Sequence, residues 1–94
     1  MKQIIDGKLY NTETATALAD NEFADGANRM NVGRSTTLYK TRKGAYFAEH
    51  CTCWQGEHDT IEVLTLEEAK SLYEGLRNQY TSYVLAFGVE PVEA

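Results

Sequence analysis

The sequence has only two cysteines, one proline and no long hydrophobic run. Two thiols cannot build a disulfide framework, and a bridge between Cys51 and Cys53, across a single residue, would be strained. No apolar run approaches the roughly 20 residues that cross a bilayer. Charge and a turn pair also interrupt the start of the chain before a signal-peptide core can form. We therefore expect a cytoplasmic protein with reduced thiols and no membrane contact.

The length and composition of the chain predict one folded domain. Its 94 residues, of which 43% are hydrophobic and 24% charged, match ordinary globular usage rather than the polar, proline-rich profile of a disordered chain. A chain of this size rarely holds two hydrophobic cores. We expect residues 1–94 to form a single domain, which argues against a two-domain enzyme.

Basic residues are outnumbered, and charge is unevenly distributed. Nine Lys and Arg against fourteen Asp and Glu give a net charge of −5, which argues against a general nucleic-acid binder because such proteins present a basic surface. Residues 26–43 nevertheless carry five basic residues and no acid, whereas nine acids follow Gly44 against Lys70 and Arg77. Two interpretations are open: solvated faces that keep the protein in solution, or patches complementary to a protein partner.

The N-terminal segment predicts a hairpin followed by a helix. Asp6-Gly7 tolerates the positive φ angles of a type I′ turn, so Lys2–Tyr10 is expected to form a tight hairpin. Asn11 or Thr12 then caps a helix from about Thr12 to Ala24, which Asp25-Gly26 ends. The apolar stripe of this helix consists of Ala15, Leu18, Ala19 and Phe23.

The central segment predicts three strands. Residues 36–41 and 45–50 are rich in strand-forming residues, and Arg42-Lys43-Gly44 joins them as a second hairpin. Residues 60–64 alternate apolar and polar side chains and are expected to pair beside that hairpin. Ala27–Ser35 has neither a helical nor a strand period and is expected to be a loop or irregular edge.

The C-terminal segment begins with a strong helix signal. Thr65 and Glu68 fit a capping box, and apolar residues continue at spacings of three and four as far as Phe87. One long helix and two helices broken near residue 79 both fit this pattern, because residues 77–79 and 81–82 are polar and favour helix less. The predicted fold is α+β: a small antiparallel sheet of two hairpins plus one strand, with two or three helices packed on one face.

One short segment has the composition of a metal site. Thiolates and imidazoles are the ligands that zinc prefers in a tetrahedral site. Cys51, Cys53 and His58 come together easily through Gly56, whereas His50 points to the other face of an ideal strand unless a bulge turns it. Acidic neighbours could substitute for it. The candidate ligands are His50, Cys51, Cys53 and His58, with Glu49, Glu57 and Asp59 as substitutes. The alternative is reduced thiols at a sheet end with exposed histidines.

Enzyme signatures are mostly absent from the sequence. It contains no Gly-x-Ser-x-Gly elbow, no His-Glu-x-x-His helix and no phosphate-binding Gly-x-x-x-x-Gly-Lys loop. A cysteine nucleophile with a neighbouring histidine and Asp59 is conceivable, but all its members would crowd into one loop, and a domain this small has little volume for a substrate pocket. We therefore predict no catalytic residues.

Aromatic residues suggest two candidate interaction sites. Trp54, beside the cysteines, is an interface candidate or a cover for the metal site. Tyr39 and Tyr46, together with the basic residues of the second hairpin, could form an aromatic and basic face suited to nucleic acid or an acidic groove. A merely solvated hairpin explains the same pattern.

Four segments of the chain carry a resemblance to known proteins. They contain turn, hairpin and helix-cap motifs and follow one another in order over nearly the whole chain. The segments are Ile5–Ala15, Leu38–Phe47, Leu64–Ala69 and Phe87-Gly88. They resemble small accessory proteins carried by phages and integrative elements of Gram-positive bacteria. Small acidic proteins from such elements include anti-CRISPR inhibitors, and at least one Cas9 inhibitor looks like a zinc-binding protein of this size.

The resemblance implies a non-enzymatic protein that acts in the bacterial host cell. It implies an inhibitor that binds a host CRISPR effector nuclease, Cas9 above all, and blocks DNA targeting, with a structural zinc. An acidic domain can dock on the basic surface that such a nuclease presents to nucleic acid. The candidate contacts are Trp54, Glu57, Asp59, Glu62, Glu67, Glu68 and Glu74. The alternative hypothesis is a nucleic-acid-associated regulator of a mobile element that uses the basic hairpin 38–47.

Overall fold

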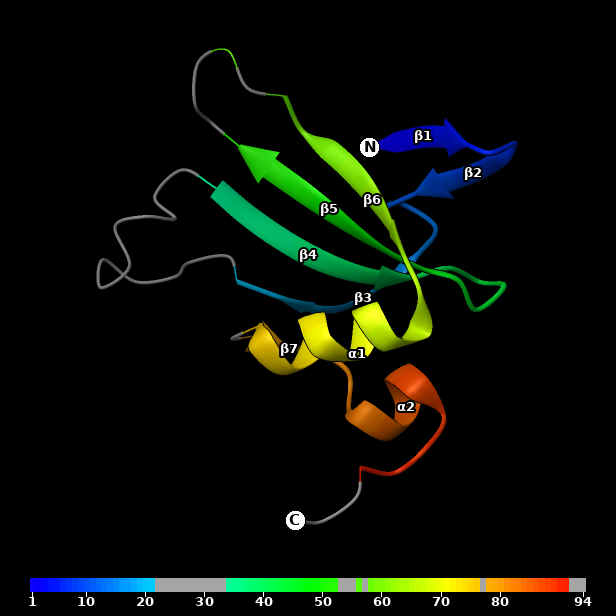
Figure 1. The fold of residues 1–94 in the computed structure, drawn as a ribbon, viewed down its shortest axis with the longest axis vertical. Helices are drawn as coiled ribbons and strands as arrows, with labels where there is room; N and C mark the ends of the chain where they lie inside the picture. The colour runs from blue at the N-terminus through cyan, green and yellow to red at the C-terminus, as the bar shows by residue number, and fades with distance from the viewer. Residues whose placement is uncertain (22–33, 53–55, 57, 77, 92–94) are drawn as a thin grey trace.

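Strands dominate the fold of the computed structural model, which describes residues 1–21, 34–52, 56, 58–76 and 78–91 (Figure 1). In chain order the elements are β1 (Lys2–Ile5), β2 (Lys8–Asn11), β3 (Thr16–Asp20), β4 (Arg34–Lys40), β5 (Tyr46–Thr52), β6 (Thr60–Leu64), α1 (Leu66–Gly75), β7 (Asn78–Gln79) and α2 (Tyr83–Phe87). The predicted α+β class with antiparallel strands is confirmed.

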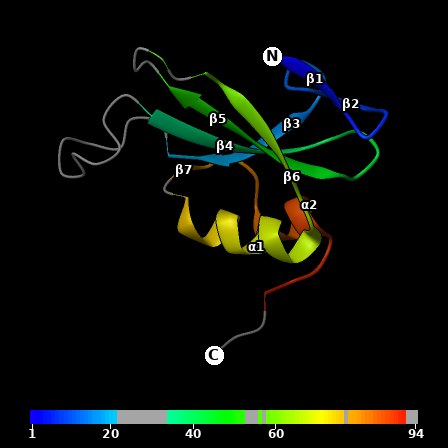
Figure 2. The ribbon, with the colours of Figure 1, turned by 45° about the horizontal axis from the view of Figure 1, so that its top comes forward.

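The strands form two sheets. The main sheet has the order β6-β5-β4-β3-β7, with antiparallel neighbours throughout, and β1 and β2 form a separate two-stranded sheet. Figure 2 shows both helices on one face of the main sheet and the β1–β2 hairpin on the opposite side. The predicted composition of the sheet is therefore wrong, because the N-terminal hairpin stands apart while β3 and β7 complete the main sheet.

Both predicted hairpins are confirmed. Asp6 and Gly7 have φ angles of 52° and 73°, the two positive values that a type I′ turn requires. In the second hairpin, the Thr41 N–H donates to the Ala45 carbonyl at 2.8 Å, and the Thr41 hydroxyl accepts from the Ala45 N–H at 3.0 Å. These bonds fix the turn, and β6 pairs beside β5 as expected.

The predicted helix over Thr12–Ala24 is wrong in the described residues, where β3 occupies Thr16–Asp20. The Asn11 side chain does accept a hydrogen bond from the Glu13 N–H at 2.9 Å, so a local contact typical of a cap forms, but the chain then enters a strand. Because β3 is an inner strand with a bulge, it buries consecutive residues rather than a helical stripe. Tertiary pairing overrides the local pattern here.

Part of the predicted N-terminal organisation lies outside the described residues. This concerns Phe23, the stop at Asp25-Gly26 and positions 27–33 of the expected loop. The last two positions of that loop, Arg34 and Ser35, belong to β4, so the strand begins earlier than the sequence pattern indicates.

The C-terminal helix is broken, in agreement with the second of the two predicted alternatives. The capping box at its start is confirmed: Thr65 Oγ1 accepts from the Glu68 N–H, and Glu68 Oε1 accepts from the Thr65 N–H. α1 ends at Gly75, the short strand β7 pairs with β3, and Ser82 caps α2.

A buried carboxylate explains why the polar residues after α1 do not continue the helix. Asp20 is 4% exposed, and its two oxygens accept hydrogen bonds from Asn78 Nδ2 at 2.9 Å and from the Tyr80 hydroxyl at 2.8 Å. A buried carboxylate is costly unless it is hydrogen-bonded. The polar residues after α1, which favour helix weakly, therefore donate hydrogen bonds to the Asp20 carboxylate and form the edge strand β7.

Two hydrophobic clusters lie on the two faces of the main sheet. The helix-side cluster contains Leu18, Ala19, Leu38, Tyr46, Ala69, Tyr73, Leu76, Ala86 and Phe87. The hairpin-side cluster contains Tyr10, Phe47 and Ile61. Consecutive residues of β5 thus belong to different clusters, as the pleat of a strand dictates. None of the described helices is long and apolar enough to cross a membrane.

We expect Tyr46→Phe to lower the free energy of unfolding by about 1–2 kcal/mol, because it removes a buried hydrogen bond and leaves a carbonyl without its donor. The Tyr46 hydroxyl donates to the Ala86 carbonyl at 2.8 Å and ties β5 to α2, and burial raises its pKa. Guanidinium denaturation measures the change. Tyr83→Phe is the matched control, because no hydrogen bond of that hydroxyl is found among the described residues. Equal midpoints for both variants would contradict the assignment.

Candidate functional site

The segment predicted to bind a metal begins at the end of β5. His50 and Cys51 are consecutive residues of that strand, and His58 and Asp59 precede β6. Cys53, Trp54 and Glu57 lie outside the described residues, so their predicted roles as ligand or partner contacts stay predictions. The described members of the segment nevertheless constrain how a metal site could be built.

Hydrogen bonds engage both ring nitrogens of His50. Nδ1 lies 3.0 Å from Thr36 Oγ1, and Nε2 lies 2.9 Å from Glu62 Oε1. Because a carboxylate only accepts, Nε2 carries the proton in this pair. The register places the three residues on the same sheet face as the helix-side cluster. Zinc binding by His50 would require it to give up one of these partners.

The order of hydroxyl, imidazole and carboxylate resembles that of a catalytic triad. In the serine protease triad, however, the hydroxyl bonds to Nε2 and the carboxylate to Nδ1, which is the reverse of the arrangement at His50. The residues that line the cavity described below also come from other parts of the fold. The three side chains therefore act as a cross-strand tie between β4, β5 and β6.

Cys51 lies on the other face of β5, opposite Ser35 of β4. Partial burial raises the pKa of its thiol to about 11, and the negative charges of Glu49 and Asp59 add to the effect. A thiol with such a pKa is neutral near pH 7, whereas a nucleophilic cysteine needs a lowered pKa. This environment does not favour the cysteine-nucleophile alternative and agrees with a reduced structural thiol.

The described residues contain no group of three or more His, Cys, Asp or Glu side chains placed to hold a metal ion. His50 and Cys51 point to opposite faces of β5, His58 is exposed, and Asp59 Oδ1 accepts from the Thr52 N–H at 2.9 Å. If His50 keeps its two partners, a zinc site of the predicted kind would combine Cys51 and His58 with Cys53. The zinc prediction depends on a residue outside the described part of the chain and stays a prediction.

The acids predicted to contact a partner fall into two groups. Asp59 directly precedes β6, at the opposite end of that strand from α1, and Oε1 of Glu62 accepts a hydrogen bond from His50. Glu67 and Glu74 are exposed on α1, and they share one side of the helix because they are seven residues apart. Glu68 is also exposed but serves the capping box.

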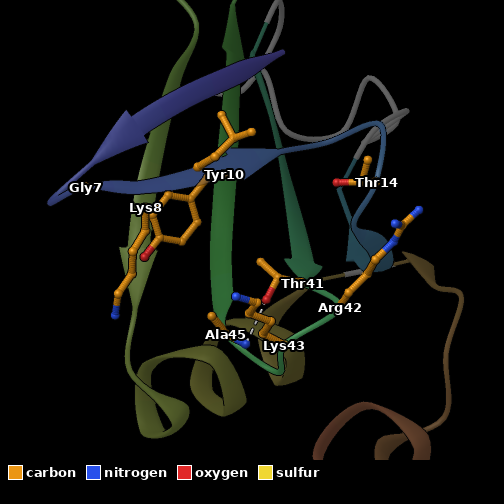
Figure 3. Close-up of a pocket in the computed structure, with 9 residues that line it drawn as sticks. Gly7, Lys8, Tyr10, Thr14, Thr41, Arg42, Lys43 and Ala45 are labelled. Atoms are coloured by element: carbon orange, nitrogen blue, oxygen red, sulfur yellow. Dashed lines mark hydrogen bonds between the residues drawn. The ribbon is translucent and has the colours of Figure 1, made fainter.

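Sequence reasoning missed a cleft between the two hairpin turns. Its volume is about 570 Å³, and Figure 3 shows Lys8 leaving β2 on one side and Arg42 and Lys43 leaving the β4–β5 turn on the other. The lining residues are Gly7, Lys8, Leu9, Tyr10, Thr14, Thr41, Arg42, Lys43 and Ala45. None of them is acidic.

The cleft exists because the N-terminal hairpin docks on the main sheet. The Tyr10 ring packs edge-on against Phe47, with ring centroids 5.5 Å apart, and Tyr10 is 5% exposed. This contact brings the β1–β2 turn beside the β4–β5 turn, although the two turns are more than thirty residues apart in the sequence. Each turn carries basic residues in the sequence, but no local pattern indicates that the turns meet.

We expect the metal-free Cys53→Ser variant to react slowly with iodoacetamide. Cys51 is its only thiol, and the raised pKa of Cys51 keeps that thiol protonated near neutral pH. The rate should rise with pH towards a midpoint near 11, and near pH 8 it should be roughly a hundredfold below that of an exposed cysteine. Glu49→Gln should speed the reaction, since it removes a nearby negative charge. A midpoint at the ordinary value of 9.0 would contradict this environment.

The zinc prediction has a direct test. Native mass spectrometry should show one zinc per chain, lost in Cys53→Ser and in His58→Gln. His50→Gln should retain the zinc, because the side chain of His50 faces away from Cys51. A chain that carries no metal after refolding with equimolar zinc would overturn the prediction.

Comparisons of the chain with protein-family models, curated proteins and solved structures found no match.

Proposed function

We propose that the protein is a non-enzymatic binding protein that docks an acidic surface on the basic, nucleic-acid-binding surface of a host nuclease complex. The resemblance of its turn and cap motifs to accessory proteins of mobile elements makes Cas9 the specific target of this proposal. A structural zinc at Cys51, Cys53 and His58 belongs to the same proposal. The observation that carries it is the pair of exposed acids on the outer side of α1.

The outer side of α1 is a fixed acidic surface. Ala69 and Tyr73 are buried against the sheet, whereas Glu67 and Glu74 project from the opposite side of the helix. Among the described residues, neither glutamate forms an ion pair with a lysine or arginine. Both charges are therefore available to a basic partner, and complementary charge raises the rate and specificity of docking.

The position of Glu74 supports a role outside the helix itself. It lies in the last turn of α1, which carries no basic residue. The helix dipole favours cations there, so an acid in the last turn costs about 0.3–1 kcal/mol at a surface position. A contact with a basic partner would explain an acid at a position where it does not help the fold.

Two features of the described residues favour binding over catalysis. The Cys51 thiol is held neutral by its raised pKa, and both nitrogens of His50 are engaged in a cross-strand tie. A general base or nucleophile needs a free, suitably poised group near a substrate cavity. The described residues that line the cleft include no histidine, cysteine, aspartate or glutamate.

The alternative function is nucleic-acid binding by hairpin 38–47. The packing of its two tyrosines within the fold does not favour this alternative. Tyr46 is 8% exposed and packs in the helix-side cluster, with Lys40 Nζ 5.8 Å from the centre of its ring. Tyr39 stacks on Phe47 at 5.1 Å between ring centroids. The Tyr46 ring is therefore buried away from any base, and Phe47 already covers one face of the Tyr39 ring, which reduces the stacking surface that single-strand binding requires. Only the basic turn of this hairpin is left as an anion-binding element.

We expect a molar excess of the protein to inhibit target-DNA cleavage by purified, guide-loaded Cas9. The double variant Glu67→Lys with Glu74→Lys should weaken inhibition at least about tenfold, because it reverses both charges on the proposed docking surface. The measurement is the protein concentration that halves the cleavage rate.

Glu13→Lys with Glu90→Lys is the matched control. Both positions are exposed, and each double variant changes the net charge from −5 by +4 to −1. The control should inhibit like the unchanged protein. Absence of inhibition across several Cas9 types would overturn the target, and equal loss in both double variants would overturn the docking surface.

A further inference from the structure

We propose that the cleft between the β1–β2 and β4–β5 turns is a binding site for a phosphate-bearing ligand of nucleotide size. The proposal is independent of the acidic docking surface, because it rests on the opposite charge and on other elements of the fold. Its basis is that Lys8, Arg42 and Lys43, from two segments far apart in the sequence, line one cavity of about 570 Å³. Cavities of roughly 300–1,000 Å³ are the usual size for small-molecule sites.

The three cations of the cleft are not neutralised within the described part of the chain. All three side chains are exposed, and no carboxylate of a described residue lies within ion-pair distance of them. Asp6 and Glu13 neighbour lining residues in the sequence but do not line the cleft. Three like charges around one cavity repel each other, and an anion between them removes that repulsion.

Two hydroxyl groups complete a donor set that suits phosphate oxygens. Thr41 Oγ1 accepts from the Ala45 N–H at 3.0 Å, which leaves its own hydrogen available to donate. Thr14 Oγ1 makes only a long contact of 3.4 Å to the Asn11 carbonyl and can turn to a better acceptor. A guanidinium fork matches two oxygens of one phosphate, and lysines add point charges.

The backbone of both turns is fixed before any ligand arrives. The Thr41 hydrogen bonds, together with the Gly44 N–H donating to the Thr41 carbonyl at 3.0 Å, fix the turn that bears Arg42 and Lys43. Positive φ angles at Asp6 and Gly7 define the opposite turn. Preorganised groups lose less conformational freedom on binding.

The test is a titration of the full ¹⁵N-labelled chain with three probes, followed by two-dimensional NMR. The probes are inorganic pyrophosphate, adenosine monophosphate and a six-nucleotide oligothymidine. We expect saturable shifts at the amides of the two turns, around Lys8 and Arg42–Ala45. The same spectra report whether each variant is folded, so a misfolded variant is recognised and replaced.

Three variants decide the assignment. Arg42→Gln with Lys43→Gln should weaken binding of the best probe at least about tenfold, and Lys8→Gln alone should weaken it severalfold, because both turns supply charge-assisted contacts. Lys70→Gln is the matched control for Lys8→Gln, since it also removes one positive charge, but from α1 on the other side of the sheet. It should leave the affinity unchanged.

The probes also separate the two sources of the phosphate. If adenosine monophosphate binds as tightly as the oligonucleotide, or more tightly, the ligand is a free nucleotide-like molecule. Much tighter binding of the oligonucleotide, with a steep dependence on salt, identifies the backbone of a nucleic-acid strand. No saturable shift with any probe at millimolar concentration would overturn the site, and so would equal weakening by Lys70→Gln and by the cleft variants.

Discussion

The alternation of side chains along β5 is the constraint on which the rest of the structure depends. Tyr46 points to the helices, where its ring lies 5.4 Å from that of Phe87, and Phe47 points to the N-terminal hairpin, where it meets Tyr10. A strand that buries large side chains on both faces must be covered on both faces. One strand thus accounts for the layer order of hairpin, sheet and helices.

The same alternation determines what the far end of β5 can do. His50 and Cys51 are neighbours in the sequence but face opposite ways, so a ligand set that looks compact in the sequence is divided by the sheet. The strand periodicity already predicts that His50 faces away from Cys51. No local pattern indicates that Thr36 and Glu62 hold the imidazole, because those partners come from two other strands.

How well the fold could be predicted depends on how local each signal is. The Asp6-Gly7 turn and the Thr65–Glu68 capping box act within four residues, and both are confirmed. β3 could not be predicted, since its conformation comes from pairing with β4 and β7 rather than from its own residues. The sequence pattern does not decide whether the C-terminal helix is broken, because the buried Asp20 that accounts for the break lies 58 residues from its partner Asn78.

The candidate cleft was beyond sequence reasoning for the same reason. Basic residues in a turn are ordinary, and only the docking of Tyr10 on Phe47 brings Lys8 to Arg42 and Lys43. The sequence does predict a polarised molecule, and the fold turns that polarity into two separate surfaces. The cleft is lined by the β1–β2 hairpin and the β4–β5 turn, while Glu67 and Glu74 project from the outer side of α1.

This separation has a physical consequence for the two proposals. Among the described residues, Glu67 and Glu74 form no ion pair with a lysine or arginine, and no carboxylate lies within ion-pair distance of Lys8, Arg42 or Lys43. Interactions between exposed charges that are not in contact are weakened by salt. Neither surface therefore neutralises the other by direct pairing. One small domain can in this way present an anion-binding site and an acidic docking surface without either cancelling the other.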